Sequence, residues 1–590
     1  MTPIWNLRPH DQDRIAALSR ESGLPPLVAH LLLNRGVTTA DAARLFLGAR
    51  RDSLHDPELL PGAVEAADRI VTAIRDGRKI VVYGDYDVDG ACGTSILWTC
   101  LKLAGARDAE YYIPHRVDEG YGLNPDALRM LATERKASMI VTVDCGVTAV
   151  DEARLARELG VELIVTDHHH AKPEWPDATV VVHPTRPGGP AYPFPEICGA
   201  AVAFKLAWQI CKSFGDGKKA SPAMRQFLTR SFDLVALATV ADVMPLEGEN
   251  RVFVRHGLRA MVDDSASVGL KALLQVCNLG MKSKLTSGIL SFAMAPRINA
   301  AGRLRHADAA VRLLTTDDAA EAQELARELD ECNKQRQDVE RAIVAEARRM
   351  VDDAGGTENL GAIVLAKEGW HPGVVGIVAA RLAETYHRPA IVIALGDAHG
   401  SGSGRSVAGF DLHAAILACS EGLLSFGGHK AAAGLKIVSA DVAAFAERFD
   451  AHCRSALTPE MRQKRIEIDA EVPLGSLSLA TVEAIDQLEP YGMGNPQPLL
   501  MAERVHVLGE PKTMGQGNSH LSWRVGQGDV SLRAVGWNMA KRLAELRPGT
   551  PCAVLFRPTI NEWNGRRDVQ LDVKDFKVMG SEDAGNARTA

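Results

Sequence analysis

Several features that would narrow the function are missing from this sequence. The ten cysteines include no C-x-x-C pair, which argues against a zinc knuckle or a disulfide framework and favours a reducing cytoplasm. No run of 18 apolar residues occurs, and the start, MTPIWNLRPHDQDR, has no basic-then-apolar signal pattern. We therefore expect a soluble, unexported protein with no membrane contact. A net charge of −7 argues against a basic coat for nucleic acid but allows a local basic groove.

The phosphate-binding motifs of nucleotide-driven enzymes are also missing. The sequence has no G-x-x-x-x-G-K-[ST] loop and no convincing G-x-G-x-x-G at the start of a helix, so neither NTP-driven chemistry nor hydride transfer is supported. What is present is an ordinary globular composition, 46% hydrophobic and 24% charged, with a mean hydropathy of −0.06. At 590 residues the chain is too long for one core, and roughly three or four domains are expected.

The order of predicted elements indicates how these domains follow one another. Residues 1–60 have a helical pattern. Residues 61–316 alternate short apolar strands with helices, which is typical of a doubly wound parallel sheet buried on both faces. Residues 317–352 contain neither glycine nor proline and predict one connecting helix of roughly 50 Å. We interpret this helix as a strut between domains rather than as a coiled-coil arm.

The rest of the chain predicts two smaller domains. A second α/β domain is expected at residues 353–460. Short strand-like runs at residues 461–579 predict a β-barrel, with an oligonucleotide-binding (OB) type as the leading candidate. Residues 580–590 are predicted to be a disordered tail. The expected fold class is therefore α/β, with a doubly wound parallel sheet, a connecting helix, a smaller α/β domain and a C-terminal barrel.

Acidic and histidine side chains follow the predicted strands at places that such a sheet brings together. In chain order they are Asp85, Asp87 and Asp89 in GDYDVDG, Asp144 in VTVDCG, Asp167 to His170 in VTDHHH, and Asp242 in the apolar segment ATVADVMPL. The carboxyl ends of the strands form the ligand crevice of a doubly wound sheet. In an extended segment Asp85, Asp87 and Asp89 would all face this crevice.

A metal site explains this convergence better than separate structural roles do. One Asp after a strand is more often a helix N-cap than a ligand, and DHHH alone could be a surface loop. Four such groups on one sheet edge would repel each other strongly without divalent cations. Mixed Asp and His ligands favour Mn²⁺, with Mg²⁺ able to substitute. A pair of these ions suits in-line hydrolysis at phosphorus, so the residues predict a phosphate ester or anhydride hydrolase.

In this order, the four motifs resemble those of the DHH phosphoesterase superfamily. Further segments are similar to the RecJ family of single-stranded-DNA exonucleases within it, among them YYIPHRVDEGYGLN, MAPRINAAGRL, GWHPGVVGIVAARL, GSGRSVAGFDL and FGGHKAAAGL. The resemblance covers nearly the whole chain. It implies a DHH domain, a connecting helix, a DHHA1-type domain and an OB fold. The implied activity is 5′→3′ exonuclease cleavage of single-stranded DNA with two Mn²⁺ or Mg²⁺ ions, in DNA repair and recombination.

The resemblance also implies roles for single residues. The implied metal ligands are Asp85, Asp87, Asp89, Asp144, His168 and Asp242. Asp85 is alternatively a catalytic base or a residue behind the ligands, and His169 either contacts the scissile phosphate or completes the metal shell. The implied contacts to DNA and its 5′ phosphate are Arg116, Arg303, Ser403 and Arg405, with His371 and His429 lining the same cleft.

The predicted barrel carries the basic surface that the whole chain lacks. Between Arg504 and Arg567 there are ten Lys and Arg residues against four Asp and Glu residues, which suits a groove for a phosphate backbone. Trp563, in the polar turn NEWNGRRD, is the best candidate for stacking on a base. We expect a monomer that binds single-stranded DNA. By family resemblance, a single-stranded-DNA-binding protein and a helicase are expected partners.

Two alternatives remain open at this point. A DHH-type pyrophosphatase, or a hydrolase of cyclic dinucleotides and very short oligonucleotides, would keep the metal site. Such relatives usually lack a long strut and a C-terminal barrel. A non-catalytic DNA-binding relative is the other alternative, but such proteins lose acidic ligands, whereas every acidic position of the motifs is filled here.

Overall fold

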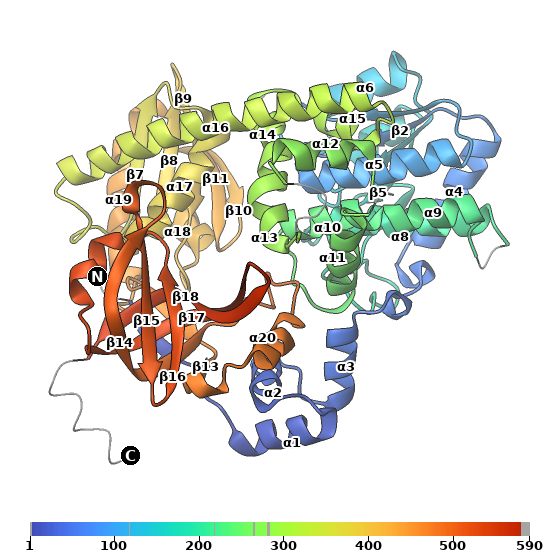
Figure 1. The fold of residues 1–590 in the computed structure, drawn as a ribbon. Helices are drawn as coiled ribbons and strands as arrows, with labels where there is room; N and C mark the ends of the chain where they lie inside the picture. The colour runs from blue at the N-terminus through green and yellow to red at the C-terminus, as the bar shows by residue number, and fades with distance from the viewer. Residues whose placement is uncertain (1–2, 117–118, 217–218, 264–265, 280–283, 580–590) are drawn as a thin grey trace. The chain divides into compact units, whose positions relative to one another are not determined.

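The computed structural model describes residues 3–116, 119–216, 219–263, 266–279 and 284–579 (Figure 1). The chain divides into two compact units. One consists of His55–Met244 and His256–Lys464, and the other of Pro3–Leu54, Pro245–Arg255 and the described part of Arg465–Ala590. Residues 580–590, predicted to be disordered, lie outside the described residues. Within the described ranges, no helix is both long and apolar enough to cross a bilayer.

The first unit begins with a five-stranded parallel sheet in the order β3-β2-β4-β5-β6. Its strands are β2 (Ile80–Tyr83), β3 (Ala109–Tyr112), β4 (Met139–Thr142), β5 (Glu162–Thr166) and β6 (Val180–Val182). The chain runs from β2 outward to β3 and then returns to β4 on the other side of β2. The strand order therefore reverses between β2 and β4, and an open α/β sheet binds its ligand beyond the carboxyl ends of the strands at such a point.

Helices cover both faces of this sheet, as predicted. α6 (Pro125–Thr133) and α7 (Val150–Glu158) pack on one face, where Leu128 and Leu131 share a core with Val81 and Ile140. α4 (Ala63–Arg75), α5 (Val88–Leu103) and α8 (Gly199–Ser213) pack together on the other. Because both faces are covered, β2 and β4 are buried along their whole length and read as continuous apolar runs.

Mostly short helices lead from this sheet to the strut. They are α9 (Pro222–Arg230), α10 (Phe232–Ala241), α11 (Gly248–Ala260), α12 (Val268–Val276), α13 (Ser287–Ile289), the π-helical turn η3 (Leu290–Met294), α14 (Ala295–Leu304) and α15 (Asp308–Thr315). Residues 248–255 of α11 belong to the second unit, and the short η2 (Pro57–Leu59) precedes the sheet. The strut itself is α16 (Ala319–Asp353), which Asp318 caps by accepting hydrogen bonds from the amides of Ala320 and Glu321. Its first half packs on α12, α14 and α15, and its second half on α17 and β7. It is a strut, as predicted, and not a coiled-coil arm.

A second sheet completes the first unit, in the order β10-β11-β9-β8-β7. Its elements are β7 (Ile363–Glu368), α17 (Pro372–Tyr386), β8 (Ala390–Leu395), β9 (His399–Arg405), α18 (Leu412–Ala418), β10 (Leu423–Gly428), β11 (Ala432–Val438), η4 (Ser439–Asp441) and α19 (Val442–Ala456). Only β7 and β8 are parallel. Ile391 and Ile393 of β8 face the core with α18 and α19, whereas Val392 faces the core with α17.

The second unit is built on a closed five-stranded barrel. β14 (Leu500–Met514), β15 (His520–Gln527), β16 (Val530–Gly536), β18 (Arg566–Val578) and β17 (Pro551–Trp563) pair in that order, and β17 pairs back with β14. The short β13 (Ala470–Glu471) pairs in parallel with the start of β14. The turns η5 (Leu474–Ser476), η6 (Gln516–Asn518) and η7 (Ala540–Glu545) complete it. The expected fold class is therefore confirmed in all its parts.

The N-terminal segment belongs to this barrel unit. α1 (Gln12–Ser22), α2 (Pro26–Leu33), α3 (Ala40–Gly48) and α20 (Leu479–Asp486) share one core with the barrel, in which Leu31 and Leu32 join Val482 and Val505. The short η1 (Arg51–Ser53) follows α3. The predicted helical pattern of residues 1–60 holds only in part. β1 (Ile4–Leu7) is a strand that pairs in parallel with β12 (Arg465–Ile468).

Candidate metal centre

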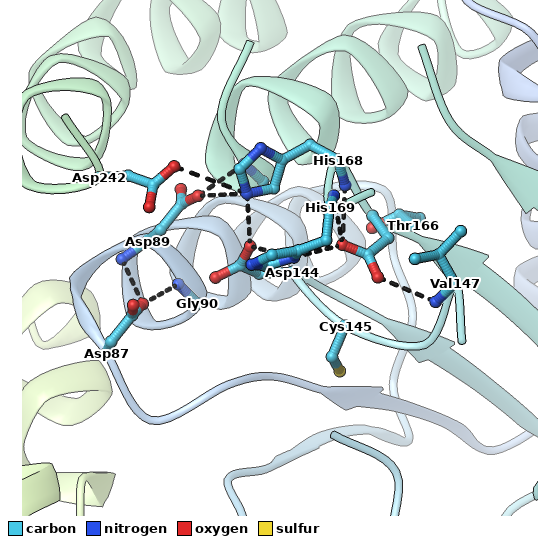
Figure 2. Close-up of polar contacts among 12 residues, drawn as sticks. Asp87, Asp89, Gly90, Asp144, Cys145, Val147, Thr166, His168, His169 and Asp242 are labelled. Atoms are coloured by element: carbon cyan, nitrogen blue, oxygen red, sulfur yellow. Dashed lines mark hydrogen bonds and ion pairs between the residues drawn. The ribbon is translucent and has the colours of Figure 1, made fainter. Parts of the chain in front are cut away.

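The segment after β2 turns directly into α5. Asp87 is the N-cap of this helix, and its Oδ1 accepts hydrogen bonds from the amides of Asp89 (2.9 Å) and Gly90 (3.1 Å) (Figure 2). Asp89 therefore lies in the first turn of α5, so the expected extended alternation of the three aspartates is wrong. A Cβ on Gly90 would lie 2.6 Å from the carbonyl oxygen of Asp85. The tight turn that gathers the aspartates thus requires glycine at this position.

Asp144 follows β4 with an unusual backbone. Its φ of 65° lies in the left-handed region, which Asp and Asn tolerate better than most residues. The Asp144 amide donates to the Thr166 carbonyl (3.1 Å), and the Tyr121 hydroxyl donates to the Asp144 carbonyl (3.1 Å). The carboxylate is thereby fixed in the buried space beyond the ends of β2 and β4.

Asp167, the first residue of the DHH motif, is fully occupied by hydrogen bonds. Its Oδ1 accepts from the amides of His168 (2.7 Å) and His169 (3.1 Å) and from Nδ1 of His169 (2.8 Å). Its Oδ2 accepts from the amide of Val147 (2.9 Å). Burial alone would raise the pKa of Asp167, but these donors hold it at about 2. Asp167 therefore positions the two histidines and is not itself a candidate ligand.

All six predicted metal ligands converge beyond β2 and β4. Nε2 of His168 lies 3.2 Å from Oδ1 of Asp144, and 3.6 Å from Oδ2 of both Asp89 and Asp242, which follows α10 (Figure 2). Ligand atoms of Asp89, His168 and Asp242 lie within 4.8 Å of one another. Those of Asp85, Asp87 and Asp144 form a second such group. Asp144 also contacts His168, so it lies where it can serve both groups.

The buried carboxylates of this cluster repel one another, and bound cations would remove this repulsion. Burial, followed by the charges of neighbouring aspartates, raises the pKa of Asp85, Asp87 and Asp144 above the ordinary range and that of Asp242 to about 8. Burial lowers the pKa of His168, which leaves its imidazole neutral and able to coordinate a metal.

Three buried ligand atoms in the described part of the chain have no hydrogen-bond partner, namely Asp85 Oδ1, Asp144 Oδ1 and His168 Nε2. Unpaired oxygen and imidazole atoms in a buried acidic cluster fit divalent cations of the Mn²⁺ and Mg²⁺ class.

His169 lies at the open side of the cluster. Burial alone would lower its pKa, but its hydrogen bond to Asp167 and the charge of that carboxylate raise the pKa to about 9. The edge of the Tyr121 ring packs on His169, with the centroids 5.6 Å apart. His183 Nε2 donates to the His169 carbonyl (2.9 Å). Neither Tyr121 nor His183 was singled out from the sequence, although Tyr121 lies in the quoted motif around EGYG.

Beside the metal centre, four guanidinium groups form what we call the arginine cluster, Arg116, Arg303, Arg336 and Arg405. Burial, followed by the charges of the other three, lowers the pKa of Arg303 to about 10. Burial and the charge of Arg116 lower the pKa of Arg405. In the described ranges no carboxylate forms an ion pair with Arg303 or Arg405, whose nearest acceptors are the carbonyls of Gly373 (2.9 Å) and Gly404 (2.8 Å). Such a cluster fits an anion.

The remaining predicted DNA contacts of the first unit lie around these two clusters. A Cβ on Gly376 of α17 would lie 3.4 Å from Oγ of Ser403 and 3.6 Å from a guanidinium nitrogen of Arg405, so this helix approaches β9 closely. His371 caps α17 by accepting from the amide of Gly373 (3.1 Å). The ring of His429 meets that of His170, which directly follows the DHH motif, with centroids 5.9 Å apart.

In the second unit, the aromatic residues of the barrel separate by exposure. Trp523 and Phe556 are core residues, whereas Trp563 is 74% exposed near the turn between β17 and β18. Trp563 is therefore accessible to a ligand of the barrel, and its stacking on a base stays a prediction. The positive charge at this turn is partly compensated, because Arg567 pairs with Glu483 (2.8 Å).

Family models match each part of the chain. The DHH family N-terminal domain matches residues 79–239, the DHHA1 domain matches residues 359–455, and the RecJ OB domain matches residues 468–575. With the acidic and histidine cluster at the strand ends, these domains define a metal-dependent hydrolase of the DHH phosphoesterase class.

Similar proteins narrow this class. The single-stranded-DNA-specific exonuclease RecJ of Bacillus subtilis is 39% identical, over 97% of this chain and 71% of that protein. That of Escherichia coli is 31% identical, over 97% and 98%. A crystal structure of Thermus thermophilus RecJ with Mn²⁺ matches with a TM-score of 0.81 at 33% identity, over 97% of this chain and 79% of that one. The chain belongs to the RecJ family.

Proposed function

We propose that this protein is a 5′→3′ exonuclease that hydrolyses phosphodiester bonds of single-stranded DNA with two divalent ions, in DNA repair and recombination. The observation that carries the proposal is the pairing of two oppositely charged clusters in one unit. The metal centre collects buried carboxylates with unpaired oxygens, and the arginine cluster collects guanidinium groups without carboxylates on Arg303 and Arg405. The RecJ relatives, named as single-stranded-DNA-specific exonucleases, support the same substrate.

Each predicted ligand has a place in this proposal. Asp89, His168 and Asp242 would hold one ion and Asp85 and Asp87 the other, with Asp144 between them. Bound there, Mn²⁺ or Mg²⁺ would neutralise charge developing on the phosphate oxygens and make water a better nucleophile. The chain's own contribution is to keep these ligands fixed before the substrate arrives. Asp167 does this for His168 and His169, and the N-cap of α5 does it for Asp87 and Asp89.

His169 is suited to contact the scissile phosphate. Asp167 keeps its Nδ1 occupied and favours the protonated ring, and His169 remains 39% exposed in its side chain. A protonated imidazole at this place would donate to a phosphate oxygen and orient it for attack. We keep Asp85 among the proposed ligands, because it has an unpaired Oδ1 and offers a carboxylate oxygen to the same group as Asp87 and Asp144.

The arginine cluster supports recognition of a 5′ end. Guanidinium groups of Arg303 and Arg405 would bind a terminal phosphate in two-pronged fashion, with Arg116 and Ser403 beside them. In the second unit, basic residues and Trp563 would hold the rest of the strand through its backbone and one stacked base. His371 and His429 are proposed to line the path of the DNA. These contacts do not depend on the DNA sequence, as is required of an exonuclease that must release and bind the strand again at each step.

Other parts of the proposal rest on family resemblance. We propose a cytoplasmic monomer that cooperates with a single-stranded-DNA-binding protein and a helicase. Size-exclusion chromatography with light scattering tests the monomer, and pull-down assays with the two purified partner classes test the interactions.

The central experiment uses labelled single strands blocked at one end or the other. With Mn²⁺ present, a strand blocked at its 3′ end should be degraded to mononucleotides, whereas a strand blocked at its 5′ end should survive. A chelator should stop the degradation of the first strand. Pyrophosphate serves as the competing substrate. Faster turnover of pyrophosphate than of a long 5′-phosphorylated strand would contradict the proposal and favour a DHH-type pyrophosphatase.

A further inference from the structure

Phe292 is the most exposed large apolar side chain in the described part of the protein, at 85%. It lies in the π-helical turn η3 between α13 and α14, where Leu290 and Met294 are buried. π-Helical turns within helices are rare and frequent at functional sites. The buried neighbours anchor the backbone of the turn, so the fold directs an aromatic side chain into solvent at this point.

This ring lines a pocket of about 430 Å³. Asn299, Arg303, Arg336 and Gln337 also line it. Its volume lies within the range of pockets that hold small ligands. One aromatic face combined with amide and guanidinium groups suits a nucleotide, whose base is flat and whose backbone is anionic.

The pocket lies between the metal centre and the arginine cluster. Ala241, another lining residue, directly precedes Asp242. Asn299 accepts a hydrogen bond from the amide of Val88 (3.1 Å), which stands between Asp87 and Asp89. On the other side, Arg303 and Arg336 belong to the arginine cluster. A group in this pocket therefore borders both clusters at once.

The acidic residue of the pocket does not oppose an anionic ligand. Glu340 pairs with Arg336 and with Arg381 (3.2 Å), so its charge is compensated. Arg341 and Gln337 are exposed at the rim, where Arg341 pairs with Asp338. The pocket thus combines compensated charge inside with a polar rim.

These placements assign an occupant, on the basis of the proposed function. If a 5′ phosphate binds the arginine cluster and the scissile phosphate lies at the metal centre, the nucleoside between those two phosphates is the 5′-terminal one. We propose that the pocket receives this terminal nucleobase and that the base stacks on Phe292. Stacking accepts every base, because each has a π face. Phe292 would then position the terminal nucleotide for cleavage without reading its sequence.

A double comparison of enzyme and substrate tests this. Phe292→Ala and the parent protein are assayed with Mn²⁺ on 5′-phosphorylated strands that carry either a normal or an abasic 5′-terminal nucleotide. The parent should prefer the normal end by about tenfold in kcat/KM, since stacking of one base on an aromatic ring has that magnitude. Phe292→Ala should lose about tenfold on the normal end and little on the abasic end. Leu103→Ala, which removes another exposed apolar side chain at the end of α5, should change neither.

A binding measurement separates this inference from the proposed function. With chelator present, a 5′-terminal 2-aminopurine should be quenched more strongly by Phe292→Trp than by Leu103→Trp, because only the first places an indole against the base. Equal quenching by the two variants, or an undiminished preference for the normal end in Phe292→Ala, would overturn the inference. A parent protein that binds strands but degrades none would instead overturn the proposed function.

Discussion

The metal centre and the arginine cluster are both gatherings of like charge, but they are built in different ways. Five of the six candidate ligands follow three strands of one sheet, and α10, packed on α5, supplies Asp242. The arginine cluster draws on four separated segments, namely the stretch after β3, α14, α16 and β9. One cluster is therefore fixed by a single sheet and a helix packed against its cover, whereas the other needs residues from both sheets and from the strut that joins them. The residues proposed for catalysis thus come from neighbouring elements of one domain, whereas those proposed to recognise the 5′ end come together only when the two α/β domains are joined.

The largest expected effect is on the metal centre itself. Asp144→Ala should lower kcat on single strands by about a thousandfold or more, since it removes several kcal/mol of charge stabilisation around the reacting phosphate. Strand binding in chelator, measured by fluorescence anisotropy, should change little, because the arginine cluster and the barrel stay intact. Asp144→Asn keeps the shape of the side chain and should behave alike.

Asp126→Ala is a suitable control for this change, because the Asp126 side chain is 93% exposed on α6. It should leave the rate unchanged. If Asp144→Ala kept a tenth of the activity, the two-ion proposal would be untenable.

An intermediate effect is expected at the arginine cluster, and it should depend on the end of the strand. Arg303→Ala should lower kcat/KM on 5′-phosphorylated strands by roughly 10- to 100-fold, the range for a buried charge-assisted hydrogen bond. Strands with a 5′ hydroxyl should lose much less. Arg303→Lys keeps the charge but loses the two-pronged geometry, so its kcat/KM on 5′-phosphorylated strands should lie between those of the parent and of Arg303→Ala. Steady-state kinetics, measured in parallel on strands with a 5′ phosphate and with a 5′ hydroxyl, give the ratio of the two kcat/KM values for each variant.

Arg305→Ala is the matched control on the same stretch, because the Arg305 side chain is 46% exposed and pairs only with Glu328 (3.6 Å) among the described residues. Its kinetics should follow those of the parent on both kinds of end. An equal loss on phosphorylated and hydroxyl ends in Arg303→Ala would show that this arginine does not recognise the 5′ phosphate.

The smallest effect on activity is expected for Asp167, which holds the two histidines but is not a proposed ligand. Asp167→Asn leaves the amide of Val147 or the ring of His169 facing a donor instead of an acceptor, at a cost of about 1–3 kcal/mol in unfolding free energy. Activity should fall by about tenfold as His169 loses its position. Affinity for Mn²⁺, measured by calorimetry, should stay close to that of the parent. A loss as large as that of Asp144→Ala would mean that Asp167 is a ligand.

Sequence reasoning found the metal centre because its signal is local. A charged residue directly after a buried strand is visible in the sequence, and the doubly wound pattern places such residues together. The path of the backbone was less predictable. Asp87 serves as a helix cap as well as a candidate ligand, and Asp89 lies inside the helix. The three aspartates therefore do converge as predicted, but they do so through the start of a helix and not through alternation along a strand.

The arginine cluster shows where such reasoning ends. Arg116, Arg303 and Arg405 were named by resemblance, but Arg336 lies among many charged residues of α16 and nothing local distinguishes it. The same limit applies to Phe292, whose exposure depends on a π-helical turn. It applies as well to the pairing of β1 with β12, since Asn6 and Glu467 are 461 positions apart. Contacts at that separation leave no periodic signal in either segment.

The pairing of β1 with β12 also has a consequence for how the molecule is made. α1, α2 and α3 leave the ribosome early, but the strands whose core they share begin only at Arg465. At ordinary rates of synthesis that is a delay of tens of seconds. During this time the parallel sheet and its acidic strand ends can already form from nearby residues. We expect the nascent chain to complete its chemical centre before its strand-holding barrel, so α1, α2 and α3, although made before this centre, reach their native neighbours after it has formed.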